Sequence, residues 1–407
     1  MTDFAELFQK RPDSADGAIK PGLSRIRRAY DFLDRPGHGL PTVLVGGTNG
    51  KGSTAGQLWR MLALAGEKPA LFTSPHLVHF SERFQIANEE IDDLRIATEW
   101  QHLRERLPSE MYEELSFFEV ATLIALSLFA EERVSHLILE VGLGGRWDAT
   151  NVVDPDLSVI TSIGRDHEQF LGHELDGIAR EKAGIMRPGK PILWGGGSGE
   201  LADQAIRAAA ATIGATLQVY PQDIVDPDLP VPSVTYQRSN LALAAAAARY
   251  FIADWTVVKE RWSESVYRPN CMRARFEHWL GAYQGRNVLV DACHNPAGAQ
   301  AFAQACDGVA SDTVFVTTSQ DKDRSGMAAA LQRQFSRVVF FGTNADRAWR
   351  PNGDLPVGTQ WYEDFETAVT AVADAVDDPS RPLVICGSIL GIGALIQSGI
   401  LRAPQPG

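Results

Sequence analysis

A lysine inside a run of glycines is the first group in this sequence that could do chemistry. Lys51 lies in the segment Gly46–Thr54, which reads GGTNGKGST. The common phosphate-binding loop is G-x-x-x-x-G-K-[ST], with a hydroxyl directly after the lysine. Here the first glycine position falls on Val45, and Gly52 separates Lys51 from the hydroxyl of Ser53. The segment therefore predicts a phosphate loop with altered spacing.

The flanking residues support this interpretation, because an apolar run precedes the loop and a helical pattern follows it. We expect backbone N–H groups to face phosphate oxygens and Lys51 to reach the outer phosphates as a point charge. Ser53 or Thr54 would bind Mg²⁺ or cap the helix. The alternative is a glycine-rich turn with a capping serine. The predicted phosphate-binding residues are Thr48, Asn49, Gly50, Lys51, Gly52 and Ser53.

Polar side chains follow several other apolar runs. Ser74 and His76 end one run, Glu140 ends a second, and Asp166 with His167 follow a third. Mg²⁺ bound to a nucleotide takes one or two carboxylates plus phosphates and waters, and imidazole is a less common ligand. Each group could equally be a satisfied polar residue at a strand end, but their convergence on a phosphate loop favours a metal site.

Lys182 lies in a helical stretch, next to Glu181. On local grounds alone it is best interpreted as a solvated or salt-bridged surface lysine.

Alternating apolar runs and helical patterns predict the fold. Runs at 41–47, 69–76, 135–145, 156–164 and 190–197 read as strands of a mostly parallel sheet covered on both faces. Ligands bind outside the carboxyl ends of such strands. The alternation restarts near residue 287, after an irregular connection at 261–279. We expect an α/β protein with a P-loop-type ATP-binding domain at 1–280 and a smaller Rossmann-like α/β domain at 281–407.

Composition limits the classes of function. The chain has 407 residues, a formal net charge of −13 and 44% hydrophobic residues. An acidic chain argues against general nucleic-acid binding, which needs a basic surface. The start lacks a signal-peptide pattern, and the longest apolar run, 120–130, is too short to span a membrane and predicts a buried helix. The four cysteines form no CxxC pair, which favours reduced thiols in a cytoplasmic protein.

These motifs together resemble one family, the folylpolyglutamate synthases and dihydrofolate synthases of the muramyl-ligase-like superfamily. The similarity runs from about residue 21 to about residue 393. It rests on VGGTNGKGST, LFTSPHLVHFSERFQI, FFEVATLIAL, LEVGLGGRWDATN, VITSIGRDHEQFLG, IAREKAGIMRPG, DACHNPAGA and DKD.

The resemblance implies a reaction. An ATP-dependent ligase of this family phosphorylates the carboxylate of a pteroate or folate to an acyl phosphate, which the amine of L-glutamate attacks. Catalysis then consists of positioning and of charge neutralisation on the moving phosphoryl group. The resemblance implies ATP and Mg²⁺ as cofactors, allows K⁺ as a further cation, and suggests a cytoplasmic monomer without nucleic-acid or membrane partners.

The resemblance also implies roles for single residues. Lys51, Lys182 and His167 would be catalytic, with Lys182 carried as a carbamate, which would overturn its interpretation as a surface lysine. The family's Mg²⁺ ligands match Ser74, Glu140 and His167. Nucleotide contacts beyond the loop match Asn240, Arg275 and Asp291. Positions near the pterin-bearing substrate or the cleft match Phe117, Phe118, Glu119, Arg146, Asp148 and His294.

Several positions depart from the family pattern. Tyr236 stands where the family has His, Arg165 adds a cation beside the metal motif, and Arg275 lacks the preceding Pro-Gly turn. These changes bear on the acceptor pocket more than on ATP chemistry. Arg165, Arg146 and Arg273 leave open a ligase for a non-folate acid. A nucleotide-binding regulator without turnover and a nucleotide kinase are the remaining alternatives, both less favoured.

Overall fold

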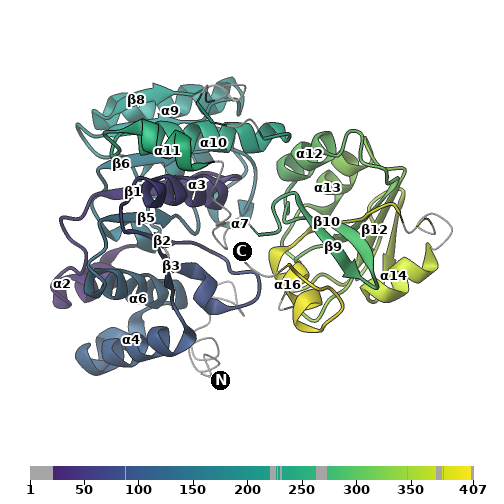
Figure 1. Ribbon diagram of the computed structural model, residues 1–407, viewed down its shortest axis with the longest axis horizontal. Coiled ribbons are helices and arrows are strands. Elements are labelled where there is room, and N and C mark those ends of the chain that lie inside the picture. Colours follow the sequence, from purple (N-terminus) through teal and green to yellow (C-terminus); the bar gives the residue numbers. More distant parts are fainter. Residues whose placement is uncertain are drawn as a thin grey trace. The chain divides into compact units, whose positions relative to one another are not determined.

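Eight of the described strands form a sheet in the order β4-β3-β2-β5-β1-β6-β7-β8 (Figure 1). The strands from β2 to β8 in this order are parallel to one another, whereas the β2–β3 and β3–β4 pairs at the other edge are antiparallel. Their bounds are β1 Thr42–Gly46, β2 Pro69–Phe72, β3 Phe84–Ile86, β4 Glu89–Glu90, β5 His136–Glu140, β6 Leu157–Ile160, β7 Pro191–Trp194 and β8 Thr216–Val219. The computed structural model describes residues 22–87, 89–220, 226, 228–229, 232–262, 273–345, 347–372, 378 and 380–404.

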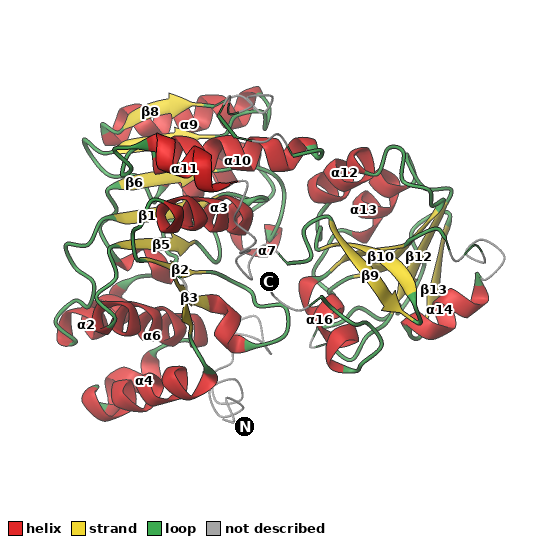
Figure 2. Ribbon diagram, in the orientation of Figure 1, coloured by secondary structure: helices red, strands yellow, loops and turns green. Residues whose placement is uncertain are grey.

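Helices cover both faces of this sheet, as the continuous apolar strands predict (Figure 2). Val43 and Val45 face a core built with α3, α10 and α11, whereas Leu44 faces the core of α2, α4, α6, α8 and α9. The bounds are α2 Ser24–Phe32, α3 Lys51–Leu64, α4 Asp93–Arg106, α5 Ser109–Glu114, α6 Phe117–Glu131, α8 Leu175–Ala183, α9 Glu200–Ile213, α10 Thr235–Ala248 and α11 Trp255–Trp262, with short helices η1 Phe80–Arg83, η2 Ala149–Val152 and α7 Glu168–Leu171.

The run at 120–130 lies in α6 and is buried, which confirms the prediction of a core helix. Ser116 begins this helix with a capping box, in which its side chain accepts from the backbone of Glu119 and its backbone donates to the Glu119 carboxylate. No helix within the described ranges is long and apolar enough to cross a membrane.

A second sheet has the order β13-β12-β11-β14-β10-β9. It is parallel except for the β9–β10 pair. Its elements are β9 Glu277–Tyr283, β10 Arg286–Asp291, β11 Thr313–Thr317, β12 Arg337–Phe341, β13 Thr359–Tyr362, β14 Leu383–Gly387, α12 Pro296–Ala305, α13 Arg324–Leu331, α14 Phe365–Ala371 and α16 Ile389–Gln397. The predicted α/β class, with two mostly parallel sheets, is confirmed.

Tertiary contacts divide the chain into two compact units. The first comprises Met1–Ser74, Phe80–Gly164 and Leu171–Cys271. The second comprises Met272–Gly407 together with the short segments Pro75–His79 and Arg165–Phe170. Two stretches near the polar strand ends therefore pack with the second unit.

The edge strands were not predicted. The segment 261–279 was expected to be irregular, but its last residues, Glu277 to Trp279, begin β9. This strand pairs with β10 through a turn in which Gln284 and Gly285 both have positive φ, a signal weaker than an Asn-Gly turn. Residues 263–272 of the connection lie outside the described residues.

Candidate active site

The predicted phosphate loop connects β1 to the N-terminus of α3, as the sequence indicates. Two of its glycines are required by their surroundings. Gly47 has φ of 139°, and a Cβ there would lie 1.9 Å from Thr161 Oγ1. Gly50 occupies the residue before α3 in the left-handed region, with φ of 87°. The first N–H groups of α3 have no partners inside the helix, which is the geometry that binds an anion.

The loop is held by the residues that follow β6. The Thr48 N–H donates to the Ser162 carbonyl at 2.7 Å, and the Asn49 N–H donates to Ser162 Oγ at 3.0 Å. Thr161 Oγ1 donates to the Asn49 carbonyl at 2.7 Å, and the Gly164 N–H donates to Thr48 Oγ1 at 2.9 Å. These bonds fix the loop before any ligand arrives, so its ordering does not oppose binding.

Two lysine amines lie at this loop. Lys51 Nζ donates to the Thr48 carbonyl at 3.1 Å, and Lys182 Nζ donates to the Gly47 carbonyl at 2.8 Å. Lys182 comes from α8 and is only 4% exposed. The local interpretation of Lys182 as a surface lysine is therefore wrong, because the helix turns this side chain toward the loop rather than toward solvent.

Asn240, predicted to contact nucleotide, lies against the loop. A Cβ built on Gly50 would come within 2.4 Å of Asn240 Oδ1, so the loop and α10 are in direct contact. Sequence spacing gave no hint of this proximity, since the two residues are 190 positions apart.

The close approach at Gly50 gives a testable prediction. Gly50→Ala would place a Cβ against Asn240 in a backbone conformation that costs an L-residue about 1–2 kcal/mol. We expect the Kd for ATP to rise by about tenfold or more, which corresponds to about 1.4 kcal/mol. Isothermal titration with ATP and Mg²⁺ measures this change.

Gly66→Ala is the matched control, because Gly66 has φ of 94° and no atom within 4 Å of the added Cβ. It carries the same conformational strain without the contact to Asn240. We expect Gly66→Ala to leave ATP affinity unchanged, because Gly66 follows α3 and lies outside the loop. Equal losses of ATP affinity in both variants would contradict a specific effect of the Gly50–Asn240 contact.

Ser74 and Glu140 lie together in the first unit. The Ser74 N–H donates to Glu140 Oε2 at 3.0 Å, and Glu140 is 5% exposed. Burial lowers the pKa of the nearby Arg83 to about 10, although the charge of Glu140 favours its protonated form. A buried carboxylate next to a hydroxyl suits Mg²⁺, which takes few protein ligands and keeps waters and phosphate oxygens. The third predicted ligand, His167, lies in a segment of the second unit.

The segment Phe117–Glu119 begins α6. Phe118 stacks on Phe72 of β2 with ring centroids 5.8 Å apart. Glu119, predicted to lie near substrate, is only 4% exposed, and it completes the capping box while both of its oxygens contact Arg25 at 3.2 Å. The structure therefore gives Glu119 a role in ordering the segment.

The buried ion pair of Glu119 predicts a cost for removing its partner. Arg25→Met would leave a buried carboxylate with only its helix-cap bonds, and we expect the free energy of unfolding to fall by about 2 kcal/mol. Arg28→Met is the control on the same helix, because the Arg28–Glu114 pair is half exposed. Denaturant unfolding that shows equal effects for both variants would contradict this role for Arg25.

Asp148 and Arg146 follow β5. Asp148 Oδ2 accepts from the Leu143 N–H at 2.8 Å, and Oδ1 accepts from the Thr150 N–H at 3.0 Å, so this carboxylate fixes the GLGG turn. Burial raises the pKa of Asp148, and these hydrogen bonds act against that rise. Arg146 is half exposed, with Nε 3.7 Å from Glu181. Of these two side chains, Asp148 is buried and Arg146 is partly open to solvent.

In the second unit, Asp291 ends β10 and orders the turn around it. Its Oδ2 accepts from the Phe276 N–H at 2.8 Å and its Oδ1 from the Cys293 N–H at 2.9 Å. Arg275 Nη1 donates to the Ala292 carbonyl at 3.4 Å. The predicted nucleotide contacts Arg275 and Asp291 thus lie close together, because Arg275 comes just before β9 and Asp291 ends the neighbouring strand β10.

Asp166 is the centre of a buried polar network in the second unit. Lys322 Nζ lies 2.6 Å from its Oδ1, while Asn295 Nδ2 and His294 Nε2 lie 3.1 and 3.2 Å from its Oδ2. Burial raises the pKa of Asp166, but His294, His167 and Lys322 outweigh it, so the pKa lies well below the usual range. Lys322 Nζ also lies 3.5 Å from His167 Nε2.

This network contains residues that the sequence did not assign. Lys322 is part of the quoted DKD motif and Asn295 of DACHNP, but neither was given a role. The orientation of the His294 ring, which the sequence left open, is fixed by its Nδ1, which lies 3.0 Å from the Ala292 carbonyl. Both ring nitrogens thus lie within hydrogen-bond distance of oxygens, Nδ1 of the Ala292 carbonyl and Nε2 of the Asp166 carboxylate.

Comparison with known proteins assigns the chain to a family. Residues 45–192 match the Mur ligase middle domain, and residues 274–389 match the Mur ligase glutamate ligase domain. The dihydrofolate synthase/folylpolyglutamate synthase of Bacillus subtilis is 32% identical over 81% of this chain and 83% of its own. The chain belongs to the dihydrofolate synthase/folylpolyglutamate synthase family. The predicted resemblance is thereby confirmed.

Solved structures of the family have the same fold. Mycobacterium tuberculosis folylpolyglutamate synthase complexed with ADP superposes with a TM-score of 0.82 at 27% identity, covering 98% of each chain. A bifunctional folylpolyglutamate synthase/dihydrofolate synthase with Mn, AMPPNP and L-glutamate bound has a TM-score of 0.76 at 29% identity, covering 93% of this chain and 94% of its own. The roles of single residues in the present chain stay predictions.

Proposed function

We propose that this protein is an ATP-dependent ligase that joins the carboxylate of a dihydropteroate or folate to the amine of L-glutamate. The observation that carries this proposal is the pair of amines at the phosphate loop, Lys51 and the buried Lys182. Family membership supplies the reaction class.

The reaction balances in two steps. A carboxylate oxygen of the acceptor attacks the γ-phosphorus of ATP, ADP leaves, and an acyl phosphate forms. The glutamate amine then attacks the acyl carbon, loses a proton, and expels phosphate as the amide bond forms. The enzyme's part is to align these groups and to stabilise charge on the transferred phosphoryl group.

We assign the loop residues Thr48 to Ser53 to the ATP phosphates. The backbone N–H groups at the start of α3 would bind phosphate oxygens, and Lys51 would turn from the Thr48 carbonyl to the outer phosphates. Asn240 would keep Gly50 in place while contributing a nucleotide contact. Arg275 and Asp291 would contribute further nucleotide contacts.

Ser74, Glu140 and His167 are the residues that would hold Mg²⁺. When bound, the ion neutralises charge on the phosphate oxygens. The Glu140 carboxylate suits this role, because it is buried and the Ser74 N–H fixes its orientation.

We further propose that Lys182 acts as a carbamate. A neutral Lys182 amine would add to CO₂ and lose a proton, forming an N–C bond and an anionic group that can approach a cation. The Gly47 carbonyl positions the nitrogen at the phosphate loop, where Lys182 is almost fully buried.

The acceptor and glutamate would bind at different groups. Phe117, Phe118 and Arg146 offer aromatic surface and a half-exposed cation for a pterin-bearing acid. His294, within the Asp166 network, would bind glutamate or the acceptor carboxylate. In domain terms, 1–280 would bind ATP and 281–407 would be the glutamate ligase domain. We place the enzyme in the cytoplasm, as a monomer.

A substrate panel tests this proposal. Purified protein would receive ATP, Mg²⁺ and L-glutamate with dihydropteroate, with a reduced folate, or with unrelated carboxylic acids. We expect ADP and a product heavier by one glutamate only with the pterins. ADP release with a different acid alone would favour the specialised ligase, for which the exposed Arg165 remains a candidate contact. Arg273 is a weaker candidate, because it pairs with Glu277 at 3.0 Å. ATP binding without any ADP would indicate a regulator.

A further inference from the structure

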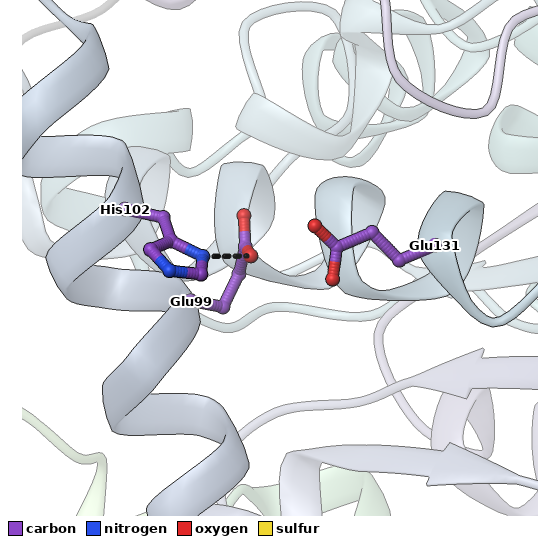
Figure 3. Close-up of side chains that lie close together, drawn as sticks. All are labelled: Glu99, His102 and Glu131. Carbon is purple, nitrogen blue, oxygen red and sulfur yellow. Dashed lines mark ion pairs between the residues drawn. The ribbon is translucent and has the colours of Figure 1, made fainter.

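Three ligand-type side chains converge outside the site described above, between α4 and α6. Glu99 and His102 lie on α4, and Glu131 ends α6 (Figure 3). One donor atom from each lies within 4.8 Å of the others. His102 Nδ1 is 3.6 Å from Glu99 Oε2 because the two residues are three positions apart on one helix face.

This cluster places the carboxylates of Glu99 and Glu131 close together, and that of Glu99 is buried. Glu99 is 4% exposed, whereas His102 and Glu131 are exposed. Burial raises the pKa of Glu99, and the neighbouring Glu131 raises it further, while His102 and Ser127 lower it. A buried carboxylate facing a second one is unfavourable unless a cation or a proton lies between them.

The nearby lysine and arginine do not supply that cation. Arg95, one turn before Glu99 on α4, pairs with Glu132, and Lys68 Nζ also contacts Glu132 at 3.2 Å. Within the described residues, the charged groups that shift the pKa of Glu99 are Glu131 and His102 alone.

An independent polar group is aimed into the cluster. Ser127 lies four residues before Glu131, on the same face of α6, and is 6% exposed. Its Oγ is buried close enough to the Glu99 carboxyl to lower the pKa of Glu99. It does not, however, reach the distance and angle of a full hydrogen bond with any described residue. Buried hydroxyls normally have a hydrogen-bond partner. The Ser127 hydroxyl would gain one if the Glu99, His102 and Glu131 side chains moved closer together around an ion.

We propose that Glu99, His102 and Glu131 bind one Zn²⁺ ion, which fastens α4 to the last turn of α6. Two carboxylates with an imidazole suit Zn²⁺, whereas Mg²⁺ and Ca²⁺ favour oxygen ligands alone. Zinc–ligand distances of about 2.1 Å require donors about 3.4 Å apart. The exposed side chains of His102 and Glu131 can rotate to reach this spacing. Water completes the tetrahedron, and Ser127 donates to the free oxygen of Glu99.

The site is structural rather than catalytic. Helix α6 has 15 residues, so Glu131 lies about 20 Å along the axis from Phe117, at the other end of the helix. Zinc would therefore stabilise the α4–α6 pair without entering the ligation reaction, and the proposal does not depend on the proposed function.

Zinc binding tests the proposal directly. Metal-stripped full-length protein, without nucleotide and with excess Mg²⁺ to occupy oxygen-only sites, would be titrated with Zn²⁺ by calorimetry and by thermal unfolding. We expect one ion per chain and a raised Tm. His102→Ala should weaken Zn²⁺ binding by about tenfold or more, and His38→Ala, at an exposed histidine elsewhere, should leave it unchanged.

A substitution of Glu99, the buried carboxylate, gives a second measurement, the Tm with and without Zn²⁺. A general folding defect would not produce the expected pattern. Glu99→Gln removes the carboxylate repulsion, so in chelator its Tm should equal or exceed that of the parent, while with Zn²⁺ it should fall below it. Co²⁺ bound to the parent should show the visible absorption of a tetrahedral site, lost in Glu131→Gln. Absence of Zn²⁺ binding, or equal binding by His102→Ala, would overturn the proposal and leave a proton shared by the two carboxyls.

Discussion

Lys182→Ala is expected to lower the kcat of ligation by at least about a hundredfold while ATP still binds. The magnitude is that of removing one group that stabilises a transition-state charge. The amine of Lys182 lies 2.8 Å from the Gly47 carbonyl, and the residue is almost fully buried. Steady-state ADP release measures kcat, and calorimetry with ATP measures binding.

Two control variants and the removal of CO₂ distinguish an effect of the positive charge of Lys182 from an effect of its carbamate. Lys182→Arg keeps a cation but cannot form a carbamate, so we expect it to be as inactive as the alanine variant. Lys190→Ala should retain full activity, because Lys190 is half exposed and pairs with Asp156. Removal of CO₂ and bicarbonate should slow the parent reversibly. Unchanged turnover in Lys182→Ala would contradict the role, and an active arginine variant would contradict the carbamate.

Asp166→Asn is expected to lower the free energy of unfolding by about 3 kcal/mol. The carboxylate accepts from Lys322, Asn295 and His294, and its side chain is 8% exposed. Removing one member of a buried charged network leaves the opposite charge uncompensated, which typically costs 3–5 kcal/mol. Turnover should fall as well, since His294 loses its partner. Denaturant unfolding of the full chain and steady-state kinetics measure the two effects.

The Lys322 partner provides the internal control for Asp166. Lys322→Met alone should also destabilise, but the double variant should be less unstable than the sum of the single ones, because the uncompensated charge disappears. Asp176→Asn should leave stability nearly unchanged, since its pair with Arg180 is exposed. Additive single and double variants would contradict a coupled network.

Much of the candidate site could be predicted because its polar residues lie at or just after the ends of buried strands. The glycine loop, Glu140 and Ser74 each come directly after a buried apolar run, and parallel strands bring such positions to one edge of a sheet. The buried helix α6 was predicted from its length and apolar content. In these cases local pattern and tertiary structure agree.

Other features depend on contacts that local sequence does not encode. Lys182 reads as a surface lysine because its neighbour Glu181 is polar, and only the packing of α8 buries it. The Asp166 network joins residues 128 to 156 positions apart. Strand β8 has alternating exposed positions, and β9 follows an irregular segment, so neither showed the apolar run that identified the central strands.

Transfer of ¹⁸O from the acceptor tests the central claim most directly. The acceptor would carry ¹⁸O in the carboxylate that is ligated, and the released phosphate would be analysed by mass spectrometry after one turnover with ATP and L-glutamate. Activation through an acyl phosphate predicts one ¹⁸O atom in each phosphate and one glutamate added to each pterin. Phosphate without ¹⁸O, alongside amide product, would contradict the account.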